Sequence, residues 1–164
     1  MTEEKRKERN EQKLLELYPS FRTRLKKVII DLEGRGFRPR IQDAWRSPED
    51  QLTAFNTGHS KLKYGFHNVT GANGAKESLA VDMLDDDFPL NSRLEYLLNL
   101  ADATRKQGLQ TGISWGLPSA LAKGIETVIA NKDWKAKVKI GWDPTHVEPI
   151  GIAAAEAKLG KRPK

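Results

Sequence analysis

The sequence of 164 residues contains no cysteine and three histidines. Without cysteine the chain has no disulfide bond, no thiol nucleophile and no zinc site built on sulfur. No apolar run approaches the roughly 20 residues that a membrane span requires, so no span is expected. The first ten residues are charged and do not form a signal peptide, which predicts synthesis in the cytoplasm without a secretion signal.

Charge, by contrast, is plentiful: 30% of the residues are charged and the net charge is +6. A basic protein favours polyanions such as nucleic acid, anionic lipid or a negatively charged cell wall. The positive residues gather in 5–7 and 158–164, and terminal runs of this kind are typical of solvated tails. The interior shows no stripe of lysine and arginine interleaved with exposed aromatics, so no nucleic-acid partner is expected.

The hydrophobic pattern predicts an α+β fold, with a small antiparallel sheet flanked by helices. Helices are expected over 3–17, from Pro19 to Gly34, over 48–57 after a Ser47 cap, from a cap at Asn91 or Ser92 to Gly108, and over 118–130. Strands are expected over 37–45, 78–84, 109–115 and 145–149. Residues 58–77 predict a long loop, and loops of that length are usually functional or disordered.

The length and the lack of internal repeats predict one domain, expected to be a monomer. Residues 1–36 form a helical segment packed on that domain in this interpretation, and residues 37–150 form its core. Residues 151–164 are expected to be a short helical or disordered basic tail.

Two histidines and one aspartate stand out as metal ligands: His67, Asp82 and His146. Two imidazoles and a carboxylate are a standard three-ligand set for catalytic zinc, which leaves a fourth position for water. The ion lowers the pKa of that water toward about 7, and a second carboxylate must then accept its proton. Asp143 suits this role, because Pro144 holds it in a turn close to His146. On spacing alone, a structural role for each histidine stays open.

Four motifs then follow one another along the chain. They are Arg46-Ser47 with Gln51, His67 before Ala80-Val81-Asp82, Gly112-Ile-Ser-Trp115, and Asp143-Pro-Thr-His146-Val-Glu148. In this order, over about residues 37–149, they resemble the D-Ala-D-Ala carboxypeptidase and L-alanyl-D-glutamate endopeptidase family, which shares a fold with the hedgehog signalling domain and includes phage endolysins. The resemblance implies that fold. It also implies zinc-dependent hydrolysis of an amide in peptidoglycan stem peptides, by an L-alanyl-D-glutamate endopeptidase or a D,D-carboxypeptidase.

The resemblance also assigns roles to individual residues. It implies that zinc is held by the two histidines and the aspartate above, with Asp143 as the general base. Arg46 would bind the substrate carbonyl or the developing oxyanion through its fork of donors. A surface ion pair of Arg46 with Glu49 or Asp50 is the alternative.

Other residues keep two interpretations each. Gln51 supports the substrate wall or faces solvent, and Trp115 lines the cleft or belongs to the core. Glu148 orients a histidine ring or simply ends a strand. His59 is expected to be a solvated loop residue. The acidic run 85–87 lacks the alternation of a calcium loop and predicts a turn with solvated acids.

The sequence departs from the family pattern at two places. Asp82 follows His67 at a greater distance than in typical members, and residues 69–77 are turn-forming and expected to loop out. Gly65 stands where relatives carry a substrate-binding serine, which leaves open which peptide is cleaved.

Two other classes of function remain as alternatives. A metal-dependent nuclease or nucleic-acid-binding protein is suggested by His67-Asn68, a pair typical of histidine–asparagine nucleases. A non-catalytic wall-binding module would have no need for Asp143. The missing signal peptide fits a phage lysin that is released to act at the cell wall.

Overall fold

The computed structural model describes all residues from Met1 to Lys164 and contains six α-helices and four strands. The helices are α1 (Glu3–Leu14), α2 (Pro19–Gly34), α3 (Pro48–Asn56), α4 (Leu94–Arg105), α5 (Ser119–Ala130) and α6 (Ala154–Lys158). The strands are β1 (Pro39–Asp43), β2 (Val81–Asp85), β3 (Leu109–Gly112) and β4 (Asp143–Pro149). Two short 3-10 turns, η1 (Phe66–Asn68) and η2 (Ala72–Gly74), interrupt the long loop. The predicted α+β fold is therefore confirmed.

The four strands form one sheet in the order β1-β2-β4-β3, and every neighbouring pair is antiparallel. Alternate residues of β2 lie on opposite faces. Val81 and Met83 are buried in the core, whereas Asp82 points to the other face and lies directly opposite His146 of β4. The sheet therefore presents one apolar face to the helices and one polar face to a cleft.

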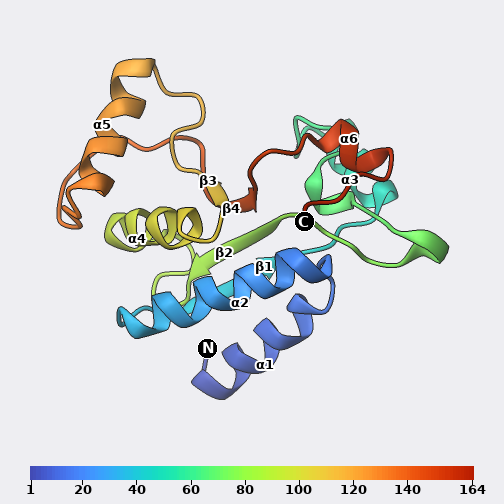
Figure 1. The fold of residues 1–164 in the computed structure, drawn as a ribbon, viewed down its shortest axis with the longest axis horizontal. Helices are drawn as coiled ribbons and strands as arrows, with labels where there is room; N and C mark the ends of the chain where they lie inside the picture. Colours follow the sequence, from blue (N-terminus) through green and yellow to red (C-terminus); the bar gives the residue numbers. More distant parts are fainter.

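Helices α2 and α4 cover the apolar face of the sheet and contact each other. The apolar residues of α2, spaced by three and four, are buried there: Phe21, Leu25, Val28, Ile29 and Leu32. The buried phenol of Tyr96 in α4 donates a hydrogen bond to the Met83 carbonyl at 2.9 Å. Figure 1 shows α5 at one end of the molecule and α3 with α6 at the other end. The sheet links these two ends.

Several element boundaries differ from the sequence prediction; for example, β2 begins at Val81 instead of 78 and β4 begins at Asp143 instead of 145. Helix α1 ends at Leu14, and β3 ends at Gly112 because residues 114–117 turn. Helix α4 begins after Arg93, which makes no side-chain cap, so the predicted cap at Asn91 or Ser92 is wrong. The Ser92 hydroxyl instead accepts a hydrogen bond from the Asp85 amide and so fixes the chain to the end of β2.

The sequence predicts that the terminal basic runs are solvated tails, but two of their arginines are bonded to the rest of the fold. Arg6 is 1% exposed, and its guanidinium donates to the Pro39 carbonyl and pairs with Glu3 and Glu33. Arg162 near the other end donates to Glu77. A buried guanidinium is tolerated because carboxylates and a carbonyl satisfy its donors. Two of the partners of Arg6, Glu33 and the Pro39 carbonyl, lie far away in sequence.

The acidic run 85–87 is also not a solvated turn. Asp85 and Asp86 are 0% and 4% exposed, and arginines surround them. Arg93 pairs with Asp85, while Arg38 and Arg40 pair with Asp86. Arg40 of β1 and Arg38, directly before β1, lie close to the end of β2, so the acids meet positive charge instead of water.

No helix in the structure combines the length and the apolar character that crossing a membrane requires.

Candidate metal centre

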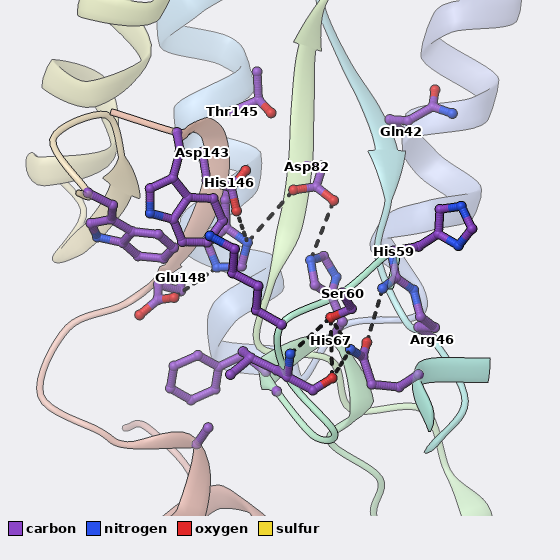
Figure 2. Close-up of a pocket in the computed structure, with 18 of the residues that line it drawn as sticks. Gln42, Arg46, His59, Ser60, His67, Asp82, Asp143, Thr145, His146 and Glu148 are labelled. Carbon is purple, nitrogen blue, oxygen red and sulfur yellow. Dashed lines mark hydrogen bonds and ion pairs between the residues drawn. The ribbon is translucent and has the colours of Figure 1, made fainter. Parts of the chain in front are cut away.

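The structure brings His67, Asp82 and His146 together, and these three residues are called the triad below. Their candidate ligand atoms lie within 4.8 Å of one another. His67 Nε2 lies 3.5 Å from Asp82 Oδ2, and His146 Nδ1 lies 3.7 Å from Asp82 Oδ1. The two imidazole rings are nearly perpendicular, with centroids 5.3 Å apart. Figure 2 shows the three side chains converging from η1, β2 and β4.

Strand pairing places two members of the triad, and a short turn places the third. Asp82 and His146 are direct partners in the register of β2 and β4. His67 sits on η1, where the Arg46 amide donates to the His67 carbonyl and the Leu79 amide donates to the Phe66 carbonyl. These two hydrogen bonds hold η1 between the segment that follows β1 and the segment that leads into β2.

The neighbouring Asn68 has a structural role. Its side-chain oxygen accepts from the Gly65 amide at 2.7 Å, and its side-chain nitrogen donates to the Arg46 carbonyl at 2.9 Å. Asn68 is fully buried, and backbone groups occupy both ends of its amide. It is therefore engaged in shaping η1 rather than facing the cleft.

The additional residues between His67 and Asp82 form a compact loop. Thr70 and Lys76 are paired as an antiparallel bridge, and the Gly71 amide donates to the Ala75 carbonyl. The segment closes on itself, so it leaves the triad at ligand distance despite the long separation in sequence.

The second nitrogen of each triad histidine has a partner that can only accept. His67 Nδ1 lies 2.7 Å from the Ala44 carbonyl oxygen, and His146 Nε2 lies 2.8 Å from Glu148 Oε1. Neither acceptor carries a proton of its own, so each ring must donate there. When both rings are neutral, this arrangement directs the lone pairs of His67 Nε2 and His146 Nδ1 toward Asp82, which is the tautomer that metal ligation requires.

The triad fits a zinc ion by donor type and by spacing. Zinc takes imidazole nitrogen and carboxylate oxygen at about 2.0–2.2 Å, so tetrahedral ligands lie roughly 3.3–3.6 Å apart. The 3.5 and 3.7 Å separations to Asp82 are close to that range. With three protein ligands, a fourth position stays open on the side of the cleft. The triad could therefore hold a metal ion of this kind.

The electrostatics of the triad follow from burial and from its carboxylates. Burial lowers the pKa of His67 and favours the neutral ring. Burial opposes the charged forms of Asp82 and His146, but their mutual attraction outweighs it. The pKa of Asp82 is lowered, and Asp82 with Glu148 raises the pKa of His146 to about 9.

Asp143 lies beside the triad at the start of β4. Its Oδ2 is 3.8 Å from His146 Nδ1, and its side chain lines the same cleft. Burial raises the pKa of Asp143, and the negative charges of Asp82 and Glu148 raise it further against the effect of His146. A raised pKa suits a carboxylate that takes up and returns a proton.

Arg46 and Gln51 form one hydrogen-bonded wall of the cleft. Arg46 donates to Gln51 Oε1 and to Asp43 Oδ2, both at 3.0 Å, and not to the acids of α3. Gln51 is 4% exposed and donates to Ser60 Oγ and to the Leu62 carbonyl, both at 2.7 Å. The alternative of a solvent-facing Gln51 is therefore wrong. The alternative of an ion pair between Arg46 and Glu49 or Asp50 is wrong as well, because Arg46 pairs with Asp43.

Aromatic rings form the wall on the other side. The Trp115 ring lies 5.2 Å from the His146 ring and 5.5 Å from the Trp142 ring, measured between centroids. Trp115 thus lines the cleft and is not a core residue. Trp142 was not predicted, although its place directly before the Asp143 motif could have indicated it.

The remaining predicted residues are also located. Glu148 holds the His146 ring, and its other oxygen accepts from Gln110 of β3 at 3.2 Å. His59 is exposed at the rim of the cleft, where its ring contacts the Thr57 hydroxyl at 2.9 Å. Figure 2 places Arg46 and His59 on one side of the triad and Asp143 and Glu148 on the other.

The cleft enclosed by these walls has a volume of about 730 Å³ and is lined by all eight predicted site residues. A cavity of this size and polarity accommodates a short peptide rather than a single small ion.

Comparison with known proteins gives a likeness to a solved structure. No protein-family model matches the sequence, and no curated protein matches it. Among solved structures, the chain is similar to the L-Ala D-Glu endopeptidase ChiX of Serratia marcescens, with a TM-score of 0.47 and 17% identity over 86% of each chain. What this chain can bind or cleave therefore follows from its own side chains.

Proposed function

We propose that the chain is a zinc peptidase that hydrolyses an amide bond in the stem peptides of bacterial peptidoglycan. An L-alanyl-D-glutamate endopeptidase activity is the first choice, and a D,D-carboxypeptidase activity is the second. The observation that carries the proposal is the convergence of the triad with Asp143 and Arg46 in one open cleft. The order of the sequence motifs supports peptidoglycan as the substrate class.

Asp143 and Arg46 each have a chemical role in the proposed reaction, and two further residues position Arg46. A bound zinc ion would supply Lewis acidity and make water nucleophilic near neutral pH. Asp143 accepts the proton of the attacking water and delivers it to the nitrogen of the leaving amine. Arg46 donates hydrogen bonds to the substrate carbonyl oxygen as negative charge develops there. Gln51 and Asp43 hold the guanidinium for that purpose.

The alternative functions have less support. A histidine–asparagine nuclease would use the Asn68 amide at its site, but this amide is bonded at both ends to backbone. A module that only binds the wall would not require a carboxylate beside three metal ligands. We also propose that the enzyme acts at the cell wall after release from the cytoplasm, as phage lysins do.

The test of the activity is digestion of purified peptidoglycan, followed by mass spectrometry of the new termini. A new carboxyl terminus at L-alanine identifies the endopeptidase, and released D-alanine identifies the carboxypeptidase. Intact peptidoglycan together with cleaved DNA would favour the nuclease instead.

Metal content is the second measurement. The purified chain is expected to bind about one zinc ion, as in other three-ligand sites. His146→Ala should abolish binding, while His59→Ala, which changes an exposed histidine at the rim, should retain it. A wild-type chain that cannot be loaded with zinc contradicts the proposal.

A further inference from the structure

Lys61 lies on the rim of the cleft, on the loop between α3 and η1. Its ammonium nitrogen is 5.2 Å from the centroid of the Trp142 ring. Trp142 contacts Trp115, which in turn contacts His146 of the triad, with centroid distances of 5.5 and 5.2 Å. This chain of contacts places the Lys61 charge on the same cleft as the triad, within a few residues of an extended peptide at 3.3–3.6 Å per residue.

One contact of the ammonium and one contact of the preceding residue restrain where Lys61 lies. The Trp142 ring attracts it as a cation–π partner. The ring itself, although 60% exposed, rests on Gly116, where an added Cβ would lie 2.8 Å from a ring carbon. On the other side, Gln51 donates to Ser60 Oγ and so holds the residue next to Lys61.

Lys61 has no carboxylate within 4.0 Å, whereas the other charges of the cleft are engaged. Arg46 pairs with Asp43, and Glu148 pairs with His146. The two remaining acids, Asp82 and Asp143, face His146 at 3.7 and 3.8 Å. The Lys61 ammonium is therefore a positive charge on the cleft that forms no ion pair within the protein.

An ammonium has three donors and no acceptor, so the group it recognises is an anion with acceptor oxygens. Hydrogen bonds between ammonium and carboxylate are about twice as strong as those between neutral groups. In a peptide substrate, a carboxylate close to the cleaved bond arises where glutamate is linked through its side chain, because its α-carboxyl group then stays free.

We propose that Lys61, held on Trp142, forms a carboxylate subsite that selects stem peptides with a free glutamyl α-carboxylate beside the cleaved amide. This inference rests on the proposed function. It adds that the enzyme discriminates against stem peptides in which the same carboxyl group is an amide. The contribution of an exposed lysine to the binding of a carboxylate is modest, and it becomes smaller as added salt screens the two charges.

The test uses two synthetic stem peptides that differ only in this group, one carboxylate and one carboxamide. The zinc-loaded wild type should show a kcat/KM about threefold to fivefold higher for the carboxylate, which is the range expected of an exposed ion pair. Lys61→Met keeps an unbranched side chain on Trp142 but removes the charge, and it should reduce the ratio to about one. Lys61→Glu should invert the preference.

Lys63→Met is the matched control. Lys63 lies on the same loop with its ammonium 5.2 Å from the Phe55 ring, and it does not line the cleft. Its loss should leave the wild-type ratio unchanged. If the wild type cleaves both peptides at equal rates, or if Lys61→Met retains the preference, the proposal of a carboxylate subsite is contradicted. The proposed peptidase function is then unaffected. If the wild type cleaves neither peptide nor peptidoglycan, the proposed function itself fails, and the subsite fails with it.

Discussion

His146 and Glu148 lie on the same face of β4, and His146 Nε2 donates to Glu148 Oε1 over 2.8 Å. The spacing of two along a strand brings these side chains together without any turn. Gln110 of β3 donates to the second oxygen of Glu148, so the carboxylate is itself held in place. The ring of His146 is thereby oriented with Nδ1 toward Asp82.

Replacing Glu148 with Gln should therefore weaken zinc binding. A glutamine still fills the space but accepts less strongly from the imidazole, and changes at such partners of metal ligands typically cost about 10–100-fold in affinity. Zinc affinity is measured by competition with a chelator. Glu126→Gln on α5, which pairs with Arg105 away from the cleft, is the control. An unchanged zinc affinity in Glu148→Gln would show that the hydrogen bond does not matter for the site.

Asp143→Asn tests the proton-transfer role separately from metal binding. The amide is of nearly the same size but cannot accept and return a proton, so turnover should fall by about 10²–10⁴-fold. Zinc content should stay near the wild-type value, because Asp143 is not one of the three ligands. Loss of zinc in this variant would instead make Asp143 a ligand, and full activity would remove it from the mechanism.

Local sequence signals predicted much of the fold. Ser47 does cap α3, where its hydroxyl accepts from the Asp50 amide, and each of the four predicted strands overlaps an observed one. Such features depend on neighbours in the chain, so the sequence shows them directly. The two histidines of the triad stood out because the chain has three histidines and no cysteine, whereas the choice of Asp82 among many acids came from the order of the motifs.

Contacts between distant residues were not predictable in the same way. Asp86 meets Arg40 only once β1 and β2 have paired, and Arg6 meets Glu33 only once α1 and α2 have packed. The side chain of Lys61 meets Trp142 for the same reason. The sequence alone predicts that each of these charged side chains is solvated, because a charged residue without a partner nearby in the chain is usually exposed.

Gln51→Ala should disturb the wall of the cleft and the stability of the fold. The buried amide satisfies Arg46, Ser60 and the Leu62 carbonyl, and leaving such groups unpaired costs about 1–3 kcal/mol. The free energy of unfolding in urea and the value of kcat/KM should both fall. Leu52→Ala, at an exposed position of the same helix, should change neither. Unchanged activity in Gln51→Ala would show that Arg46 needs no such support.

Glu3→Gln should alter how stability depends on pH. Hydrogen bonds from Arg6 and Arg38 lower the pKa of Glu3 from 4.5 to about 2. A carboxyl group with a lowered folded-state pKa stabilises the fold above 4.5, and this contribution is lost as the pH falls toward 2. The difference in Tm between wild type and variant should therefore be largest above pH 4.5 and should vanish near pH 2.

The control for Glu3 is Glu8→Gln in the same helix. Glu8 is exposed and makes no ion pair, so its substitution should shift Tm little at any pH. A Tm difference for Glu3→Gln that stays constant from pH 7 to pH 2 would contradict the role given to this carboxylate.

Two glycines provide a matched pair for the packing of the aromatic wall. A Cβ on Gly141 would lie 2.4 Å from the backbone nitrogen of Trp115, whereas a Cβ on Gly124 of α5 meets nothing within 4 Å. Gly141→Ala must push Trp115 away from the start of β4, so it should destabilise the fold by about 1–3 kcal/mol and lower peptidase activity. Gly124→Ala should stabilise by about 0.5–1 kcal/mol, because alanine favours a helix interior. Urea unfolding measures both, and a harmless Gly141→Ala would mean that the contact between Trp115 and this strand is not needed to shape the cleft.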